Sequence, residues 1–293
     1  MNKKLLLTIV LTLVASILPD IIFQEWTGTR PVWLPYVKLA VLAAAAIACR
    51  LSPELKQLAR YPVVLVTIIA ASLFTGYIGG LAWWQSTFDP GTFSGNFGGA
   101  ILLKFIGIIP VIGVLLLLYR SPREVYLAAG DLSVKADQIK WLGIKKDQIS
   151  WGKLSVISAV LIALGTFLLT IFTVTGFTVT DTLAQLISYL PLIILMALVN
   201  SFSEGIVYRN AVLGPLKAVL PKNQIVMVAA VFFGIAHYYG APSGVVGVVM
   251  SGVLGWFMCR SMYETGGLAA SWIIHFLQDV VIFSTLLLMT VYI

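Results

Sequence analysis

Five ionisable residues lie inside the last apolar stretches of this 293-residue sequence, where charged side chains are otherwise rare. In chain order they are Glu204, Arg209, His237, His275 and Asp279, and the two histidines are the only ones in the chain. An ionisable group in hydrocarbon costs on the order of a few kcal/mol, so each one is by default a functional hypothesis. A carboxylate beside an imidazole could activate a water molecule for hydrolysis.

The spacing of the histidines predicts two local pairs. His275 and Asp279 are four residues apart, so they share one face of a helix and can point into one cavity. Phe233 precedes His237 by one helical turn, so the phenyl ring can form a wall beside the imidazole. A histidine inside a membrane span can also hold helices together through hydrogen bonds alone, and this alternative stays open.

Glu204 and Arg209 are five residues apart, about 140° around a helix, which disfavours a direct pair. Arg209 therefore needs another partner, such as Asp279, Glu264, a lipid phosphate or a substrate carboxylate. It could also be a simple anchor at the inner face of a membrane. We expect Glu264, in the stretch RSMYETGG, to be a solvated loop residue.

The composition predicts a membrane protein. Hydrophobic residues make up 59% of the chain and charged residues only 11%, compared with about 25% charged residues in soluble domains. The net charge of +7 does not indicate a nucleic-acid partner, because the basic residues lie in the loops between apolar runs, where they orient a membrane protein. Cys49 and Cys259 form no paired pattern, which argues against a disulfide framework or a thiolate metal site.

Apolar runs predict an all-α, polytopic transmembrane bundle of about eight to nine spans. The basic start MNKK is followed by an apolar run without a cleavage site, which favours a retained first span over a signal peptide. The nine candidate spans lie near 5–23, 33–49, 62–82, 99–118, 154–176, 183–204, 223–239, 244–260 and 267–290.

The basic residues predict an orientation with the N-terminus in the cytoplasm. In that orientation sixteen of the nineteen lysines and arginines fall on the inner side. The other three are Arg30, in an outer loop, and Lys38 and Lys104, which we expect to reach the outer surface along their own side chains. The chain then divides into a four-helix membrane region (1–118), a cytoplasmic, interfacial amphipathic loop (119–153) and a second membrane domain (154–293).

Depth presents a difficulty for a common site. If its helix ends near residue 204, Glu204 lies at the inner end, whereas His237 follows Lys222 by 15 residues, about 22 Å along a helix. The two residues can then meet only if 205–222 dips into the membrane or the helix at 223–239 tilts strongly. Gly214 and Pro215 would permit such a break.

Three segments together resemble the CPBP family of CAAX proteases and bacteriocin-processing enzymes, also called Abi proteins. The family pattern is E-E-x-x-x-R, then F-x-x-x-H, then H-x-x-x-N or H-x-x-x-D. The corresponding segments in this chain are Glu204 to Arg209, Phe233 to His237 and His275 to Asp279. The resemblance covers roughly 154–290, and three motifs in order at this spacing are far more specific than any one alone.

The resemblance implies a glutamic-type intramembrane endopeptidase. In such an enzyme Glu204 and His237 would hold and activate a water, with Glu204 as the general base, and an apolar surrounding would make that carboxylate a competent base near neutral pH. His275 and Asp279 would correspond to the oxyanion-stabilising pair, with Asp279 either protonated or orienting His275. We also expect Arg209, Phe233 and Tyr208 to bind substrate or support these groups.

The chain departs from the family pattern at one position, because Gly205 replaces the second glutamate of the first motif. This departure keeps open a non-catalytic scaffold that binds a peptide or membrane partner, as in bacteriocin immunity or regulation. A transporter with an intramembrane proton relay is a third reading, which the lack of an inverted repeat disfavours.

The expected partners are the lipid bilayer and a peptide or membrane-protein substrate, in a bacterial cytoplasmic membrane, and the sequence does not predict an oligomeric state. We expect no metal and no other cofactor. A Zn²⁺-dependent variant is the alternative, since Glu, His and Asp side chains can all bind zinc, but the sequence contains no HExxH motif.

Overall fold

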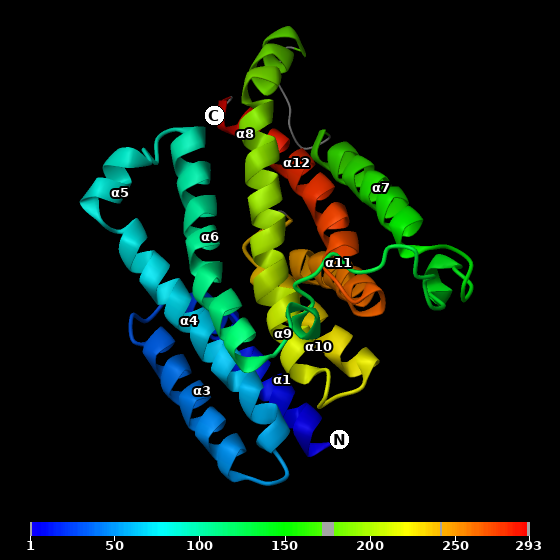
Figure 1. Cartoon of the computed structure of the whole chain (residues 1–293). Coiled ribbons are helices and arrows are strands. Elements are labelled where there is room, and N and C mark those ends of the chain that lie inside the picture. The colour runs from blue at the N-terminus through cyan, green and yellow to red at the C-terminus, as the bar shows by residue number, and fades with distance from the viewer. Residues whose placement is uncertain (1, 172–178, 241, 292–293) are drawn as a thin grey trace.

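The computed structural model of the protein describes residues 2–171, 179–240 and 242–291, and these residues form a helical bundle without a β-strand (Figure 1). The all-α fold class is therefore confirmed. The α-helices are α1 (Lys3–Ala15), α2 (Leu18–Thr27), α3 (Leu34–Leu51), α4 (Arg60–Gly79), α5 (Ala82–Thr87), α6 (Phe93–Leu118), α7 (Trp151–Ile171), α8 (Val179–Gly205), α9 (Ala211–Leu216), α10 (Lys222–Ala236), α11 (Gly244–Thr265) and α12 (Ala269–Val291). Shorter 3₁₀ helices are η1 (Lys56–Ala59), η2 (Pro122–Val125) and η3 (Lys140–Leu142), and η4 (Ile206–Asn210) is a π-helix.

Seven helices of the described chain are long and apolar enough to cross a membrane, and the number rises to eight if α1 and α2 form one bent span. The chain is thus a multi-pass membrane protein. The candidate at 223–239 was wrong as a span, since α10 has only 15 residues, about 22 Å, against a hydrocarbon core of about 30 Å. The expected end of the 154–176 candidate at residue 176 lies outside the described residues.

The first candidate span is broken rather than continuous. The axes of α1 and α2 meet at 53°. Pro19 lies at the start of α2, where its missing N–H is tolerated, and the same missing N–H keeps α1 from continuing through this position. The hydroxyl of Ser16 accepts a hydrogen bond from the backbone N–H of Leu18 at 3.1 Å and so satisfies a donor at this break.

Helix α8 was expected to end near residue 204, but the helical chain continues beyond it. It continues through the π-helix η4 into α9, and the span that contains Glu204 reaches Leu216. Glu204 therefore lies twelve residues, about 18 Å, before the end of its span at Leu216. His237, about 22 Å beyond the start of α10, is at a similar depth, so neither a dip of the chain nor a strong tilt is needed.

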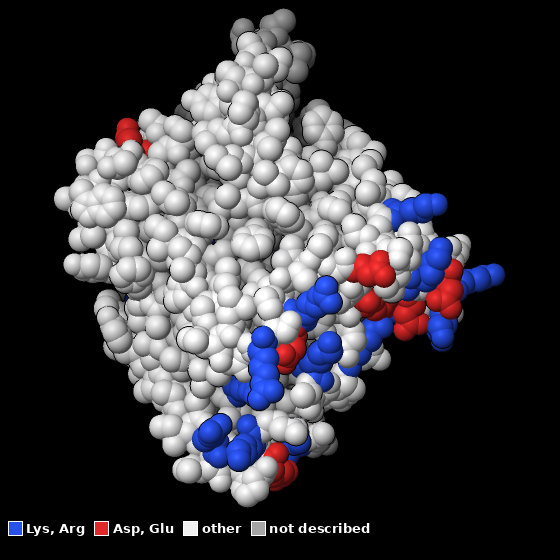
Figure 2. Space-filling model, in the orientation of Figure 1, with Lys and Arg blue, Asp and Glu red and all other residues white. Residues whose placement is uncertain are grey.

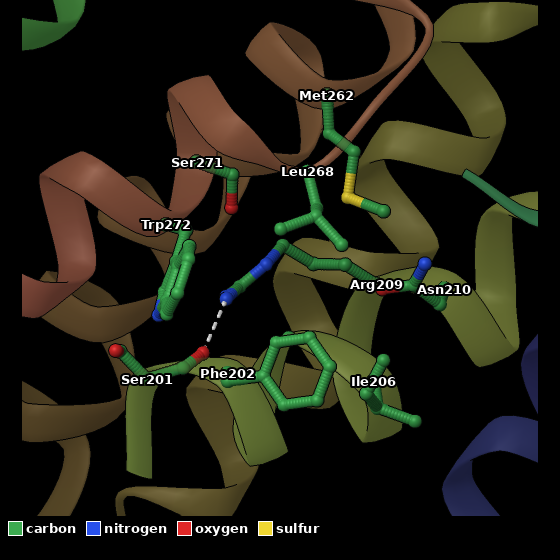
Figure 3. Close-up of a pocket in the computed structure, with 10 residues that line it drawn as sticks. Ser201, Phe202, Ile206, Arg209, Asn210, Met262, Leu268, Ser271 and Trp272 are labelled. Atoms are coloured by element: carbon green, nitrogen blue, oxygen red, sulfur yellow. Dashed lines mark hydrogen bonds between the residues drawn. The ribbon is translucent and has the colours of Figure 1, made fainter. Parts of the chain in front are cut away.

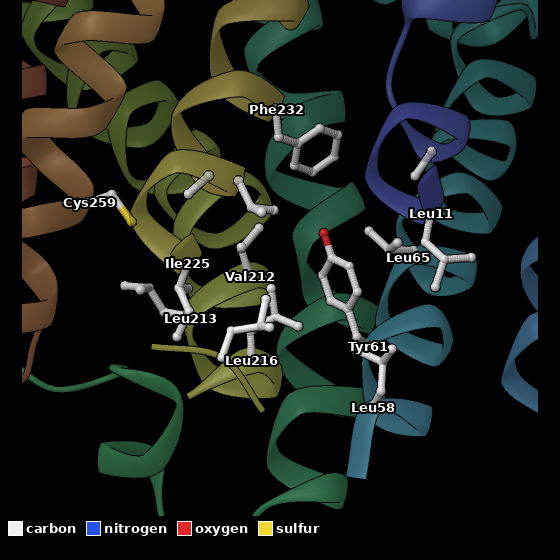
Figure 4. Close-up of a cluster of buried hydrophobic side chains, with 14 of the residues drawn as sticks. Leu11, Leu58, Tyr61, Leu65, Val212, Leu213, Leu216, Ile225, Phe232 and Cys259 are labelled. Carbon is white, nitrogen blue, oxygen red and sulfur yellow. The ribbon is translucent and has the colours of Figure 1, made fainter. Parts of the chain in front are cut away.

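The N-terminal helices pack directly on the C-terminal ones. Figure 4 shows the buried cluster in which Leu11 of α1 and Leu65 of α4 face Val212 of α9 and Phe232 of α10. Within α1 and α4, the hydroxyls of Thr12 and Tyr61 form a buried hydrogen bond of 2.7 Å. The region before residue 119 and the region after 154 thus share one apolar core, while the proposed division into three domains stays a prediction.

The segment 119–153 folds against the end of the bundle that carries the N-terminus. Figure 2 shows that lysines and arginines gather on this end in the view of Figure 1, and the orientation with this end in the cytoplasm stays a prediction. The segment closes on the start of α12, because the backbone N–H groups of Leu268 and Ala269 donate to the carbonyls of Ala128 and Ala129 at 2.8 and 3.1 Å.

The expectation that Glu264 is a solvated loop residue was wrong. It lies in the last turn of α11, and only 8% of its side chain is exposed. Its carboxylate accepts hydrogen bonds from Lys222 at 2.6 Å, from the indole N–H of Trp151 at 2.7 Å and from Arg260 at 2.8 Å. Glu264 thus ties the segment 119–153 and α10 to α11, and it is not available to Arg209.

The contact between Gly130 and Gly267 allows this closure. A Cβ atom on Gly267 would lie 2.2 Å from the backbone nitrogen of Gly130, and one on Gly130 would lie 2.8 Å from the nitrogen of Gly267. These are backbone atoms on both sides, so neither can give way as a flexible side chain would. The two backbone segments approach this closely only because both residues are glycines.

We predict that Gly267→Ala lowers the thermal unfolding midpoint of the detergent-solubilised protein, because the added methyl group costs about 1–3 kcal/mol of overpacking. The matched control is Gly113→Ala in α6, where an added Cβ meets nothing within 4 Å. Equal midpoints for the two variants would show that the close contact at Gly267 does not hold the segment.

Candidate active site

Glu204, His237, His275 and Asp279 come together inside the bundle. The Oε2 atom of Glu204, in the last turn of α8, lies 3.5 Å from Nε2 of His275 and 4.0 Å from Nε2 of His237. Asp279 follows His275 by one turn of α12, and its Oδ1 lies 3.5 Å from the same Nε2. Three helices far apart in sequence therefore direct two imidazoles and two carboxyl groups to one point.

The contact of the imidazole on the side away from Glu204 fixes which nitrogen of His237 carries the proton. Its Nδ1 lies 2.8 Å from the carbonyl oxygen of Phe233, which can only accept, so Nδ1–H is the donor. In the neutral ring Nε2 then carries a lone pair, and this lone pair faces Glu204. The ring of Phe233 lies against the imidazole with centroids 4.3 Å apart.

The second histidine has the opposite tautomer. Nδ1 of His275 lies 3.3 Å from an Nη2 nitrogen of Arg209, and a guanidinium can only donate, so Nδ1 accepts. The proton of the neutral ring is therefore on Nε2, which faces Glu204 and Asp279. The site thus presents one imidazole as an acceptor and the other as a donor.

Lys104 was not among the residues expected in the site, and the expectation that its side chain reaches the outer surface was wrong. Nζ of Lys104 donates to Oε1 of Glu204 at 2.8 Å and to Oδ1 of Asn200 at 2.7 Å. The amide nitrogen of Asn200 in turn donates to Oδ2 of Asp279 at 3.0 Å. The surrounding of Glu204 is therefore not purely apolar, since a cation faces one of its oxygens.

Two signals in the sequence could have revealed these residues. Lys104 lies eleven residues into α6, about 17 Å along a helix of 26 residues, which is too deep for its side chain to reach the surface. Asn200 precedes Glu204 by four residues and so lies on the same face of α8.

Lys104 leaves the other oxygen of Glu204 unoccupied. Oε2 is buried and accepts no hydrogen bond from the described residues. Buried carboxylate oxygens are normally hydrogen-bonded, and the nearby Nε2–H of His275, at 3.5 Å, makes no hydrogen bond with this one, which leaves room for a further donor. A water molecule or a substrate N–H group has the required chemistry.

A cavity of about 230 Å³ between α4, α6 and α8 reaches this cluster. Glu204, Lys104 and Tyr208 line it together with Ser72 and Thr75 of α4. About half of the Lys104 side chain is exposed, at 49%, against 13% for Glu204. The N-terminal helices α4 and α6, for which the sequence predicted no role, thus line one side of the cavity that leads to the carboxylate.

Arg209 does not contact any of the acidic partners expected for it. It is buried, with 1% exposed, and Nη2 donates to the backbone carbonyl of Ser201 at 3.4 Å besides its contact with His275. Its guanidinium also lies 5.7 Å from the centre of the Phe233 ring. Tyr208, the residue before it, packs edge-on against the same ring at 5.6 Å.

Among the described residues, no three His, Cys, Asp or Glu side chains are placed to hold a metal ion. The expectation that the site needs no metal stays a prediction, which a chelation experiment can test.

Residues 185–281 match the family model described as type II CAAX prenyl endopeptidase Rce1-like. The resemblance to CAAX proteases is therefore confirmed over these residues, a shorter stretch than the 154–290 expected. The matched segment contains Glu204, His237, His275 and Asp279 but not Lys104. No curated protein and no solved structure shows a significant match to the chain. The matched family is one of proteases, which supports a hydrolase in a membrane.

We predict that Lys104 and Glu204 are energetically coupled. Lys104→Met leaves a buried carboxylate without its cation, so unfolding becomes easier, and a double-mutant cycle with Glu204→Gln should give a coupling energy of about 1–3 kcal/mol. The matched control is the exposed ion pair of Lys3 and Glu54 at 3.0 Å, for which about 0–1 kcal/mol is expected. Additive effects of Lys104→Met and Glu204→Gln would contradict the pairing.

Proposed function

We propose that this protein is an intramembrane endopeptidase that hydrolyses a peptide bond with a water molecule activated by Glu204 and His237. The observation that carries this proposal is the pairing of two free acceptors, Oε2 of Glu204 and Nε2 of His237, at 4.0 Å. The match to an endopeptidase family over the segment that contains both residues supports the same reaction.

The geometry suits one water molecule. Two acceptors 4.0 Å apart can both receive a hydrogen bond of about 2.8 Å from the same oxygen, at an angle of about 90° between the two bonds. This angle is near that between the two O–H bonds of water, so one water can donate to both residues at once. Its lone pairs then point away from both, toward the place of a substrate carbonyl.

The reaction follows from these contacts. Glu204 takes a proton from the water as the hydroxide oxygen bonds to the scissile carbonyl carbon, and the carbonyl oxygen becomes an oxyanion. The C–N bond then breaks, and Glu204 returns the proton to the leaving amine. Lys104 favours the ionised form of Glu204 that can accept this proton, and it also orients the carboxylate by holding Oε1.

The oxyanion needs hydrogen-bond donors. The Nε2–H of His275 is the donor that the tautomer assignment leaves for this role. Asp279 supports it in one of two ways: a protonated carboxyl donates to the oxyanion, whereas an ionised one orients His275 through Oδ1 at 3.5 Å. Asn200 holds the other oxygen of Asp279 and so keeps Oδ1 turned toward the ring.

We propose a peptide or a segment of a membrane protein as the substrate, cut in the inner half of the membrane. The start of α12 and the end of α9 both lie at the end of the bundle that is rich in basic residues. His275 follows the start of α12 by six residues, about 9 Å, and Glu204 precedes the end of α9 by about 18 Å. The cavity between α4, α6 and α8 is the proposed entrance. A bacterial cytoplasmic membrane is the proposed location.

Gly205 favours a second candidate, a non-catalytic scaffold that binds a peptide or membrane partner. The family pattern has a second glutamate at this position. Glycine offers no carboxylate to the guanidinium of Arg209, which residue 205 faces. In the scaffold the same cavity would bind a partner without cutting it, so variants at Glu204 would leave the biological function intact.

We predict that Glu204→Gln and His237→Ala, each in reconstituted full-length protein, lose cleavage by a factor of about 10² or more. A tiled library of membrane-protein peptides, read by mass spectrometry, supplies the substrates, and binding is measured separately for any peptide that is cut. Binding should be retained, because both variants remove a proton acceptor rather than the cavity.

The matched control is Glu54→Gln, which neutralises an exposed carboxylate far from the cavity and should keep full activity. The proposed reaction is contradicted if either active-site variant cleaves as the unmodified protein does. If the unmodified protein cuts nothing while the variants keep their biological function, the scaffold is the better explanation.

We predict that cleavage survives exhaustive chelation, because Glu204 and His237 alone can activate the water. The measurement compares the protein before and after treatment with a zinc chelator, with a zinc protease as the positive control for chelation. Activity that disappears and returns on addition of Zn²⁺ would replace this mechanism by a metal-dependent one.

A further inference from the structure

A second, smaller cavity lies beside the catalytic cluster, between the end of α8, η4 and the start of α12 (Figure 3). Its volume is about 10 Å³, the space of roughly one water molecule. The only charged side chain that lines it belongs to Arg209, and no acidic residue is among the lining residues. The other lining residues are Ser201, Phe202, Gly205, Ile206, Asn210, Met262, Leu268, Ser271 and Trp272.

The guanidinium of Arg209 is incompletely paired. Nη2 contacts the carbonyl of Ser201 and the ring of His275, but Nε and Nη1 are buried without a hydrogen-bond partner among the described residues. No described carboxylate lies within ion-pair distance of the group. A buried cation in a membrane protein normally pairs with an opposite charge, so this arrangement lacks a counterion.

Gly205 provides the space for one. A Cβ atom at this position would lie 3.1 Å from Nη2 of Arg209, which shows that residue 205 faces the guanidinium directly. An acidic side chain here would supply the negative charge from the protein. With glycine, the charge has to come from outside the chain.

We propose that this cavity binds a single halide ion, chloride under physiological conditions, as the counterion of Arg209. Chloride is a single atom only slightly larger than the water molecule for which the cavity has room, whereas a carboxylate or phosphate has several heavy atoms and does not fit. The donors available to the ion are the free N–H groups of Arg209 and the hydroxyl of Ser271, which Figure 3 shows beside the guanidinium.

The ion acts on the catalytic cluster through a single contact. Nη2 of Arg209 holds Nδ1 of His275 at 3.3 Å and so keeps the proton of that ring on Nε2. A counterion bound by Nε or Nη1, which have no partner among the described residues, fixes the orientation of the guanidinium without competing for the contact of Nη2. Arg209 is therefore a positioning residue, and the halide completes its support in place of a carboxylate at position 205.

The test measures the thermal unfolding midpoint of the full-length protein in detergent as sodium gluconate is replaced by sodium chloride or bromide at constant ionic strength. We expect a rise in the midpoint that saturates with halide concentration, as binding to the folded state alone requires. Gly205→Glu should lose this rise because its carboxylate takes the place of the ion. Gly205→Ala, which fills the space with a methyl group, should also lose it.

The matched control is Gly165→Ala in α7, where an added Cβ meets nothing within 4 Å and which should keep the halide response. An unmodified protein with no saturable difference between halide and gluconate would overturn the proposal, since the cavity would then hold only water. Gly205 variants that both keep the halide response of the unmodified protein would also overturn it. The readout is binding, so it does not depend on whether the protein cleaves peptides.

Discussion

The ion pair between Lys104 and Glu204 is the interaction on which the site depends. A carboxylate inside a membrane must be neutralised, protonated or hydrogen-bonded, and here a lysine from α6 provides both a charge and a hydrogen bond. The pair joins the N-terminal helices to the segment that matches the endopeptidase family. The pair also gives the two carboxylate oxygens different contacts: Oε1 is held by Lys104, and Oε2 faces the two histidines without a hydrogen bond.

The continuation of α8 through a π-helix sets the depth of this pair. A π-helix has one extra residue in its hydrogen-bonded turn, and such turns often occur at functional sites. Here it immediately follows Glu204 and Gly205, and both Arg209 and Asn210 within it are buried. The chain can therefore pass the site, direct the guanidinium of Arg209 toward His275 and still continue to Leu216 as one span.

The sequence predicted the fold class and the residues that converge, but not how they reach one another. Spacing of four residues placed His275 and Asp279 on one face, because helical geometry alone determines that relation. It could not show that 206–216 continues the helix, since Gly214 and Pro215 read as a break when their tertiary contacts are unknown. It also missed Lys104 as a site residue, because its partner Glu204 is 100 residues away in the sequence.

The helix α10 was counted as a span because its sequence is as apolar as that of a membrane-crossing helix. The apolar run at 223–239 is a short helix buried among other helices, and its hydrophobicity reflects contacts with protein rather than with lipid: Phe232 and Phe233 are 3% and 1% exposed. Periodicity cannot separate these two surroundings for a run of this length. The distinction comes from α11, which packs along α10 so closely that a Cβ on Gly234 would lie 2.6 Å from the carbonyl oxygen of Val248.

Gly205 shows how one position can matter on both sides of a helix end. Glu204, one residue earlier, faces the two histidines, whereas residue 205 faces the guanidinium that fixes the tautomer of one of them. Losing a carboxylate at 205 removes nothing that touches the proposed water, so the reacting groups remain in place. The missing carboxylate would have held Arg209. Its loss therefore affects the hydrogen-bond donor His275, which Arg209 contacts, and not the proposed base Glu204.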